Sequence, residues 1–167
     1  AAHLEKKENE LNRQLVNIND LIQGVIDSFK LQLDAKPSSV HTKFEASPSE
    51  IWIDEEYFLH VLSNLIDNAI KYAKSEIDIT IITKTLSNKL FITIEDKGIG
   101  MTPDTVKHIF EKFYRAHAGN IHNVKGFGLG MSYVKWVIDL HKGTIHVTSE
   151  LNKGTKVEIS LPLIEPK

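Results

Sequence analysis

Three glycines, Gly126, Gly128 and Gly130, come directly before an apolar helical pattern in the stretch NVKGFGLGMSYVKW. Glycines at the start of a helix allow an anionic group to contact bare backbone N–H groups. A P-loop is excluded, because Gly130 is followed by Met131 and Ser132 instead of Lys and Ser or Thr. A Rossmann fingerprint is excluded because a third glycine is missing and the preceding run, HAGNIHNVK, is polar. The glycines therefore predict an anion site of another kind.

A second group of polar residues, His60, Asn64, Asn68 and Lys71, recurs at spacings of four, four and three. This spacing places the four side chains on one stripe of a helix. Asparagine has modest helix propensity, so two of them inside a helix indicate a role beyond the helix itself. Carboxamide oxygens are hard ligands that suit Mg²⁺, and a neighbouring lysine suits phosphate. An ordinary solvated helix face is the alternative interpretation.

An aspartate, Asp96, ends the strand-like run KLFITIED and is followed by Gly98 and Gly100 in DKGIGM. Glycines after a strand allow a ligand to approach the backbone closely. The carboxylate is suited to accept a hydrogen bond from an exocyclic amine at the floor of a pocket. A tight turn capped by the aspartate side chain explains the same residues without a ligand.

The polar stripe lies on a strong helical pattern that spans residues 54–74. A rotation of about 100° per residue separates two further stripes on this helix. The apolar stripe, which we expect to pack on a sheet, comprises Phe58, Leu62, Leu65 and Ala69. The stripe that we expect to face water comprises Glu56, Ser63, Asp67 and Lys74.

Runs of alternating β-branched residues predict the strands. EIDITIITKT and KLFITIED form a hairpin around a turn at Ser87 and Asn88, and TIHVTSE and TKVEISLPL form a last hairpin around LNKGT. VHTKFEA reads as an edge strand and SPSEIWI as a short extended piece. Strands and helices are mixed along the chain, which predicts an α+β fold with a mixed sheet and helices on one face.

The N-terminal apolar pattern, residues 4–29, fits one long helix or two helices broken at VNIND, where two asparagines and an aspartate supply capping side chains. We favour the break, with a short extended LVNI between the pieces, and expect Pro37 to end the second helix.

Later in the chain, Thr102 followed by Pro103 predicts a helix start. The polar residues 116–125 predict a surface loop, and a helix is expected over residues 128–141 with its stop at Gly143.

Composition narrows the class of protein. The 167 residues are 41% apolar and 25% charged, which is typical of one soluble globular domain. The net charge of -2 gives no footprint for nucleic acid, and the absence of cysteine excludes disulfides and thiol chemistry. No apolar run reaches the roughly 18 residues of a membrane span, and no signal peptide is visible. The chain begins Ala1-Ala2, so we expect it to be a piece of a longer protein.

Five strings occur in an order that resembles the ATP-binding domain of bacterial sensor histidine kinases, within the gyrase, Hsp90, histidine kinase and MutL superfamily. NLIDNAIKYA (64–73) resembles the N box, DKGIGM (96–101) the G1 box and IFEKFYR (109–115) the F box. GFGLGMS (126–132) resembles the G2 box, and NKGT (152–155) stands where a last glycine-threonine element is expected. The ordered set is specific, and the F box favours the kinases over the ATPases.

The resemblance covers residues 16–163 and implies a Bergerat-type α/β sandwich. In it, a mixed, mostly antiparallel sheet carries about three helices on one face, and a flexible lid closes over ATP. Residues 1–15 would then be the tail of a dimerisation and phosphoacceptor hairpin, and residues 164–167 a C-terminal tail.

The resemblance also implies roles at the adenine end of the nucleotide. Asp96 would bind the N6 amine of adenine, and Thr155 would support that end through water. Gly98 and Gly100 would admit the nucleotide, and Tyr72 would flank the base. An ordinary core tyrosine is the alternative for Tyr72.

At the phosphate end, the resemblance implies that Asn68 coordinates Mg²⁺ with Asn64 beside it. Lys71 and Arg115 would offset phosphate charge. The triphosphate would contact the backbone of one segment, which comprises Lys125, Gly126, Phe127, Gly128, Leu129 and Gly130. Phe127 departs from the small residue common at its position and puts the geometry of the lid in doubt.

Two residues bear on the reaction. Superfamily members that hydrolyse ATP carry a glutamate base one turn before the metal asparagine, and Asn64 stands there, which argues against an ATPase. His3 lacks the following acidic residue and proline of a phosphoacceptor, so the acceptor is expected on a hairpin absent from this chain. The implied function is transfer of the γ-phosphoryl group of ATP to that histidine. The alternative is a catalytically silent ATP-binding module. A metal pair at His117 and His122 is disfavoured by the polar loop around them.

The resemblance further implies partners and location. The chain would work with its own hairpin domain and a response regulator, as the cytoplasmic domain of a membrane-anchored bacterial sensor. The piece alone is expected to be monomeric and the parent a homodimer.

Overall fold

The computed structural model describes residues 11–112 and 130–164. Its main sheet has five strands in the order β2-β4-β5-β7-β6, and β1 and β3 form a separate two-stranded sheet. The strands are β1 (Gln14–Asn17), β2 (Ser38–Glu45), β3 (Glu50–Ile53), β4 (Ile77–Leu86), β5 (Lys89–Asp96), β6 (Thr144–Glu150) and β7 (Gly154–Pro162). The helices are α1 (Ile18–Ser28), α2 (Lys30–Asp34), α3 (Glu55–Lys71), α4 (Pro103–His108) and α5 (Gly130–Leu140).

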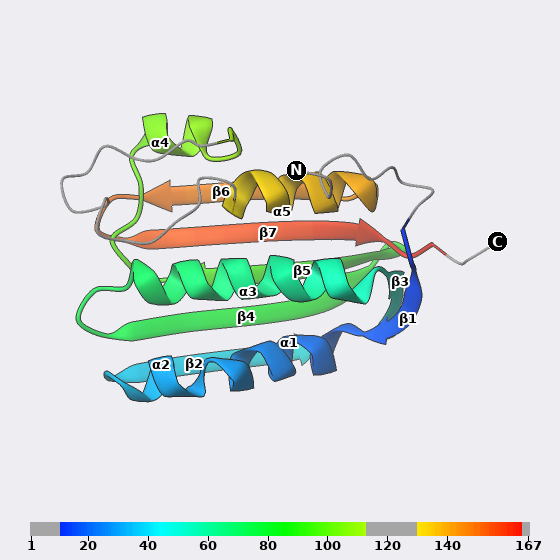
Figure 1. The fold of residues 1–167 in the computed structure, drawn as a ribbon, viewed down its shortest axis with the longest axis horizontal. Helices are drawn as coiled ribbons and strands as arrows, with labels where there is room; N and C mark the ends of the chain where they lie inside the picture. The colour runs from blue at the N-terminus through cyan, green and yellow to red at the C-terminus, as the bar shows by residue number, and fades with distance from the viewer. Residues whose placement is uncertain (1–10, 113–129, 165–167) are drawn as a thin grey trace.

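The sheet is mixed, as the sequence predicted. β2 pairs parallel with β4, whereas the other three pairings are antiparallel. The long helices α1, α3 and α5 lie side by side on one face of the sheet (Figure 1), and α2 and α4 are short additions. The expected three helices on one face are therefore present, although the described residues contain five helical segments. No helix among those residues is both long and apolar enough to span a bilayer.

The β4–β5 hairpin is set by local turn chemistry. Ser87 and Asn88 both have positive φ, 53° and 62°, and the register pairs Leu86 with Lys89 across them. Two consecutive left-handed residues form the turn whose twist matches that of the flanking strands. The predicted turn is confirmed, and it fixes which residue ends β5.

The buried stripe of α3 is confirmed. Phe58 and Leu62 are fully buried, and Leu65 and Ala69 are nearly so. The helix ends at Lys71, so the predicted end at residue 74 is wrong. Because Tyr72 adopts a non-helical conformation as the C-cap, the chain leaves the helix there. Of the stripe expected to face water, Glu56 and Lys74 are exposed, whereas Ser63 and Asp67 are half-buried.

The N-terminal segment is broken where predicted. Asn17 caps α1 by accepting a hydrogen bond from the backbone N–H of Asp20 at 3.1 Å. The expected second helix is itself divided at Phe29, which has a non-helical conformation between α1 and α2. The expected extended piece LVNI, residues 15–18, corresponds to β1, which begins one residue earlier, at Gln14, and ends at Asn17. Residues 1–10 lie outside the described part of the chain.

The end of α5 differs from the prediction that Gly143 stops the helix. The left-handed residue is Lys142, with φ of 59°, and α5 ends at Leu140. Gly143 is required for close packing instead, since a Cβ there would lie 2.4 Å from the carbonyl oxygen of Ser160 on β7. The first two residues of the predicted helix, 128 and 129, lie outside the described residues.

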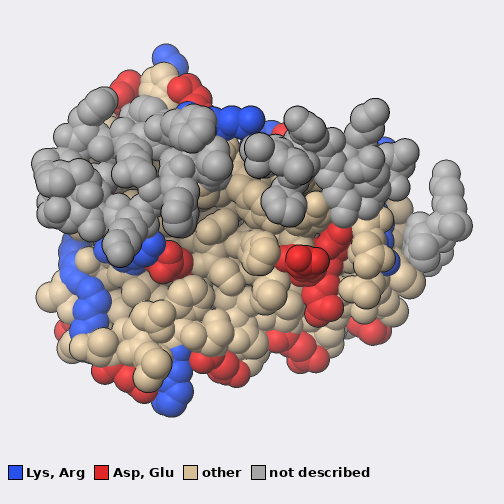
Figure 2. Space-filling model, viewed as in Figure 1, with Lys and Arg blue, Asp and Glu red and all other residues tan. Residues whose placement is uncertain are grey.

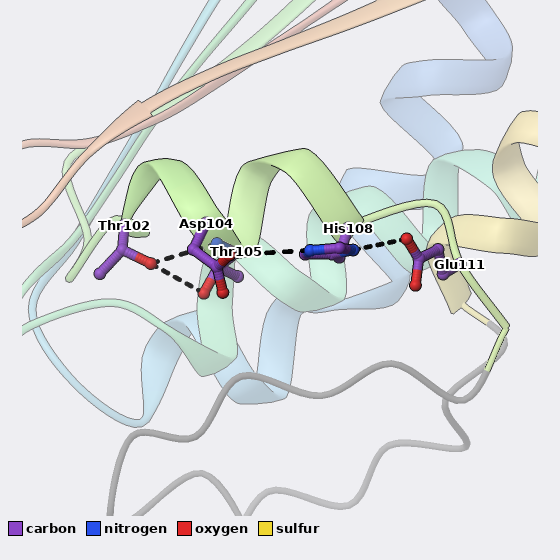
Figure 3. A network of polar contacts seen from close by, with 5 residues as sticks. All are labelled: Thr102, Asp104, Thr105, His108 and Glu111. Atoms are coloured by element: carbon purple, nitrogen blue, oxygen red, sulfur yellow. Dashed lines mark hydrogen bonds and ion pairs between the residues drawn. The ribbon is translucent and has the colours of Figure 1, made fainter.

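The predicted start of α4 is confirmed. The Thr102 hydroxyl accepts a hydrogen bond from the N–H of Thr105 at 3.1 Å, and Pro103 is the first helical residue. Figure 3 shows His108 at the other end of the helix, between two carboxylates. Its Nδ1 lies 2.5 Å from Glu111, and its Nε2 lies 3.6 Å from Asp104. Because Glu111 lies in the predicted F box (109–115), this network joins the described start of the F box to α4.

Asp54 joins three parts of the fold and is 5% exposed. Its carboxylate accepts from the N–H of Tyr57 at 3.3 Å, which caps α3, and from the N–H of Asn12 at 3.1 Å. Its own N–H donates to Nε2 of buried His141 at 3.0 Å. The Nδ1 of His141 lies 2.8 Å from the carbonyl oxygen of Val137, so Nδ1 carries the ring proton. The start of the chain, α3 and the end of α5 are thereby linked at one buried residue.

We expect Asp54→Ala to lower the free energy of unfolding by about 1–3 kcal/mol, because it removes a helix cap and leaves buried N–H groups without their acceptor. Urea denaturation measures the change. Asp34→Ala is the matched control, since Asp34 is exposed and its ion pair with exposed Lys30 is worth about 0–1 kcal/mol. Equal losses in the two variants would contradict the role assigned to Asp54.

Candidate functional site

The candidate site begins with one cross-strand row at the end of the sheet. Asp96 on β5 is opposite Thr155 on β7, and Thr155 is opposite Ser149 on β6. On the other side Asp96 is opposite Ile79, which is buried beneath the helices. Because directly paired residues point to the same face of a sheet, the three polar side chains lie on the helix-covered face. All three are half-buried there.

Asp96 is held by backbone N–H groups. Its Oδ1 accepts from the N–H of Gly98 at 2.8 Å, and the N–H of Thr155 also bonds to the carboxylate. Burial raises the pKa of Asp96 above its ordinary value, although both N–H groups counteract the shift and nearby Glu95 adds to it. A carboxylate that has lost solvent but kept polar neighbours binds strongly to any hydrogen-bond donor that reaches it. This observation supports the interpretation of Asp96 as an acceptor for an amine.

The glycines of the G1 box and of the last turn are required by contacts within the protein. A Cβ on Gly98 would lie 2.4 Å from the carbonyl oxygen of Tyr72. Gly100, with φ of +68°, would meet the carbonyl oxygen of Glu150 at 2.0 Å, and Gly154, with φ of +121°, that of Asp96 at 2.0 Å. The sequence predicted that Gly98 and Gly100 admit a ligand to the backbone, whereas in the structure their close neighbours are the protein's own carbonyl groups.

The segment that follows Asp96, residues 97–101, is called the G1 loop here, and hydrogen bonds hold it on two sides. The N–H of Ile99 donates to the carbonyl oxygen of Tyr72 at 2.9 Å, and the carbonyl oxygen of Ile99 accepts from the N–H of Asn152 at 2.7 Å. Lys74 also donates to the carbonyl oxygen of Asn152. The end of α3 and the β6–β7 turn therefore hold the loop that follows Asp96 in place.

Ser149 is a site residue that the sequence analysis missed. Its hydroxyl contacts the N–H of Met101 at 2.8 Å, the carbonyl oxygen of Gly154 at 2.9 Å and the hydroxyl of Thr155 at 2.8 Å. The alternation of TIHVTSE contained the signal, because it places Ser149 on the same face as Ile145 and Val147. A polar residue on the buried face of a strand, near the strand's end, is the feature that could have identified Ser149.

Near the end of α3, the polar stripe faces the start of α5. Asn64 and Asn68 are half-buried, and Nδ2 of Asn68 lies 3.7 Å from Sδ of Met131 in the first turn of α5. Lys71 pairs with Asp67 at 2.8 Å, and His60 is exposed on the stripe near Tyr133. Asn68 lies one turn before Tyr72, whose carbonyl anchors the G1 loop, so the stripe and the Asp96 row meet at the same end of α3.

The amide of Asn68 fits a hard cation. Its nitrogen is directed at the Met131 sulfur, which leaves the carboxamide oxygen as the ligand atom. Among the described residues, no three His, Cys, Asp or Glu side chains gather as a metal site. In phosphate complexes Mg²⁺ commonly keeps water and phosphate oxygens as ligands beside one or two protein oxygens, and the Asn68 carboxamide oxygen suits such a site.

Basic side chains occur at this end of the molecule. In Figure 2 lysine and arginine side chains lie along the left edge, where Figure 1 places the end of α3 and the β6–β7 turn. Acidic side chains are more frequent toward the right and along the lower edge. This distribution favours an anionic ligand at the end of the sheet where Asp96 lies.

Several predicted site residues fall outside the described residues. They are Arg115 of the F box and the phosphate-binding segment Lys125, Gly126, Phe127, Gly128 and Leu129. The loop 116–125 expected as a lid, with His117 and His122, also lies there. Gly130 is described as the first residue of α5, and among the described residues nothing lies within 4 Å of a Cβ built on it.

Solved histidine kinases share this fold. Full-length ShkA in complex with AMPPNP gives a TM-score of 0.83 at 23% identity and covers 99% of this chain and 34% of that chain. The nucleotide-free catalytic domain of histidine kinase ThkA gives a TM-score of 0.80 at 23% identity, with coverage of 92% and 99%. The fold is therefore that of a histidine kinase catalytic domain.

The sequence agrees with the fold. Residues 53–165 match the family of histidine kinase-, DNA gyrase B- and HSP90-like ATPases, and the chain belongs to this family of ATP-binding domains. The family predicted from the order of the five strings is thereby confirmed.

Two relatives are sensor proteins. The sensor protein RprX of Bacteroides fragilis is 44% identical over 163 residues, which are 96% of this chain and 31% of RprX. The sensor histidine kinase YvrG of Bacillus subtilis is 30% identical over 149 residues, which are 89% of this chain and 26% of YvrG. The chain thus spans less than a third of the length of either relative.

We expect Gly98→Ala to destabilise the protein by about 1–3 kcal/mol, because the added methyl group overlaps the Tyr72 carbonyl and the loop has to move. Thermal or urea denaturation measures the loss. Gly24→Ala in α1 is the control. Among the described residues nothing lies within 4 Å of a Cβ built on Gly24, and alanine is more stable than glycine in a helix by about 0.5–1 kcal/mol. A stable Gly98→Ala protein would refute the close contact.

Proposed function

We propose that this chain binds Mg-ATP and donates the γ-phosphoryl group to a histidine on a helix hairpin of the same sensor protein. The observation that carries the proposal is the meeting, at the end of α3, of an acceptor row on the sheet and a carboxamide stripe on the helix. The row supplies acceptors for a base, and the stripe supplies a ligand for a metal beside phosphate. The sensor proteins that the chain resembles support the kinase assignment.

At the adenine end, Asp96 accepts the hydrogen bond of the N6 amine. Thr155 supports this contact from the next strand, and Tyr72 flanks the base. Gly98 and Gly100 allow the loop that carries these contacts to pack against the end of α3 and the β6–β7 turn. The base thus binds to groups fixed by backbone contacts.

At the phosphate end, Asn68 coordinates Mg²⁺ and Asn64 assists beside it. When bound there, Mg²⁺ would supply positive charge against the charge that develops during phosphoryl transfer. Lys71 and Arg115 add positive charge, and Lys71 stays oriented by its pair with Asp67. The segment of Lys125, Gly126, Phe127, Gly128, Leu129 and Gly130 offers backbone N–H groups at the start of α5.

The residue at position 64 favours a kinase over an ATPase. A general base has to accept the proton of the attacking water, and the amide of Asn64 does not do so at neutral pH. Water therefore attacks slowly, and the γ-phosphoryl group is preserved for the histidine. The proton acceptor for that histidine belongs to the hairpin.

The wider assignment follows from the kinase proposal. The tail of the hairpin ends before β1, because Gln14 and Leu15, which the sequence assigned to that tail, pair with β3. The catalytic and ATP-binding domain extends from β1 to residue 163, and residues 164–167 are a tail. The parent is a homodimeric, membrane-anchored bacterial sensor with this domain in the cytoplasm, and it passes the phosphoryl group to a response regulator. This domain alone is monomeric.

The deciding experiment uses the full-length parent with ATP labelled at the γ-phosphate. We expect acid-labile label on a histidine of the hairpin, and loss of that label in Asn68→Ala because Mg²⁺ loses its protein ligand. Asp34→Ala, on an exposed helix end, is the control and keeps the label. Nucleotide binding without label would favour the silent module, and fast release of free phosphate would favour an ATPase.

Asp96→Asn tests the adenine contact. The asparagine oxygen takes over the Gly98 N–H, so its NH₂ group faces the N6 amine as donor against donor. We expect ATP to bind about 10- to 100-fold more weakly, whereas GTP, which has a carbonyl at position 6, loses less. Calorimetric titration with both nucleotides measures the difference. Equal losses for ATP and GTP would rule out the contact between Asp96 and adenine.

A further inference from the structure

Ser149 makes three contacts that the proposed function does not use. Its Oγ lies 2.8 Å from the N–H of Met101 at the end of the G1 loop, and 2.9 Å from the carbonyl oxygen of Gly154. The third contact is with Oγ1 of Thr155 at 2.8 Å. Ser149 thus touches the loop, the turn and a residue of the proposed adenine site at the same time.

The three contacts fix the direction of each hydrogen bond. A hydroxyl carries one proton and accepts up to two hydrogen bonds. The carbonyl oxygen of Gly154 only accepts, so it takes the proton of Ser149, and the N–H of Met101 only donates. The contact with Thr155 therefore has Thr155 as donor and Ser149 as acceptor.

The direction of this bond determines what Thr155 presents on its other side. Its single proton is committed to Ser149, so the rest of the oxygen offers only lone pairs. Its neighbour across the strands, Asp96, is a carboxylate and also an acceptor. The end of the row therefore presents two adjacent acceptors and no hydroxyl donor.

We propose that Ser149 is a positioning residue that keeps the Thr155 hydroxyl an acceptor and thereby makes the site select purines with an amino group at position 6. The inference rests on the proposed function, since it needs the base to lie at Asp96 and Thr155. Without the Ser149 oxygen, the Thr155 hydroxyl rotates and donates either to Asp96 or to a carbonyl at position 6. Either rotation weakens the preference for an amine.

A purely structural role for Ser149 predicts a different result. The bonds to Met101 and Gly154 join the G1 loop to the β6–β7 turn, and their loss would loosen the whole adenine end. Such loosening would weaken the binding of every purine nucleotide by a similar factor. The ratio of two affinities separates the roles, because it cancels a common loss.

The test compares ATP with inosine triphosphate, which carries a carbonyl in place of the amine at position 6. Dissociation constants for both are measured by titration of the wild-type protein and Ser149→Ala. We expect the preference for ATP to fall by about threefold to tenfold in Ser149→Ala, the value of one neutral hydrogen bond. Thr148→Ala, at the neighbouring exposed position on β6, should keep the wild-type ratio.

A matched pair keeps the test decisive if Ser149→Ala does not fold. Ser149→Thr and Ser149→Val have nearly the same shape and differ in a hydroxyl against a methyl group. Only the threonine variant should keep the wild-type ratio. In a Thr155→Val background, Ser149→Ala should no longer change the ratio, because Ser149 acts through Thr155.

The outcomes separate this inference from the function on which it rests. The inference is supported if Ser149→Ala and Ser149→Val lower the preference for ATP over inosine triphosphate and Ser149→Thr keeps it. If the wild-type protein prefers ATP and the Ser149 variants keep the same preference, the role of Ser149 is overturned and the proposed function stands. A wild-type protein without preference for ATP overturns the adenine site and the inference with it.

Discussion

The site depends on one close contact between backbones, where the end of α3 meets the G1 loop. The carbonyl oxygen of Tyr72 accepts the N–H of Ile99 at 2.9 Å, and only a glycine at position 98 leaves room for it. α3 carries Asn68 one turn earlier, and the loop follows Asp96 directly. The contact therefore sets the position of the proposed metal-binding end of the site relative to its proposed base-binding end. A shift of the loop would move both.

The directions of the hydrogen bonds determine which groups at the proposed adenine end act as acceptors. Backbone N–H groups hold the carboxylate of Asp96, while burial raises its pKa. The bonds of Ser149 leave Thr155 an acceptor beside it. Two partly desolvated acceptors bind a ligand most strongly when it brings a hydrogen-bond donor. A buried acceptor without a hydrogen bond costs free energy, and the ligand's donor recovers that cost. The proposed selectivity for an amine thus depends on which oxygen carries each hydroxyl proton as well as on the shape of the site.

The opposite end of the same helices is tied to the beginning of the chain. Asp54 caps α3, accepts the N–H of Asn12 and donates its own N–H to His141 at the end of α5. Both helices that the proposed site uses are thus anchored at one buried carboxylate. Their other ends, which carry Asn68 and Met131, meet near the site. Both helices are thus linked at one end, which suits the proposed binding of a metal and phosphates near their other ends.

The sequence by itself determined which segments form helices and strands, the order of the five strings and the family, because periodicity, helix caps and turn residues act over a few neighbours. It did not determine the ends of α3 and α5 or the division between α1 and α2. The hairpin turn at Ser87 and the start of α4 were predictable for this reason. Tertiary structure alone decided that β2 lies parallel to β4, that Gly98 makes room for a carbonyl, and that Ser149 contacts Thr155. Each of these depends on chain segments brought together by folding, and no local pattern records which segments will meet.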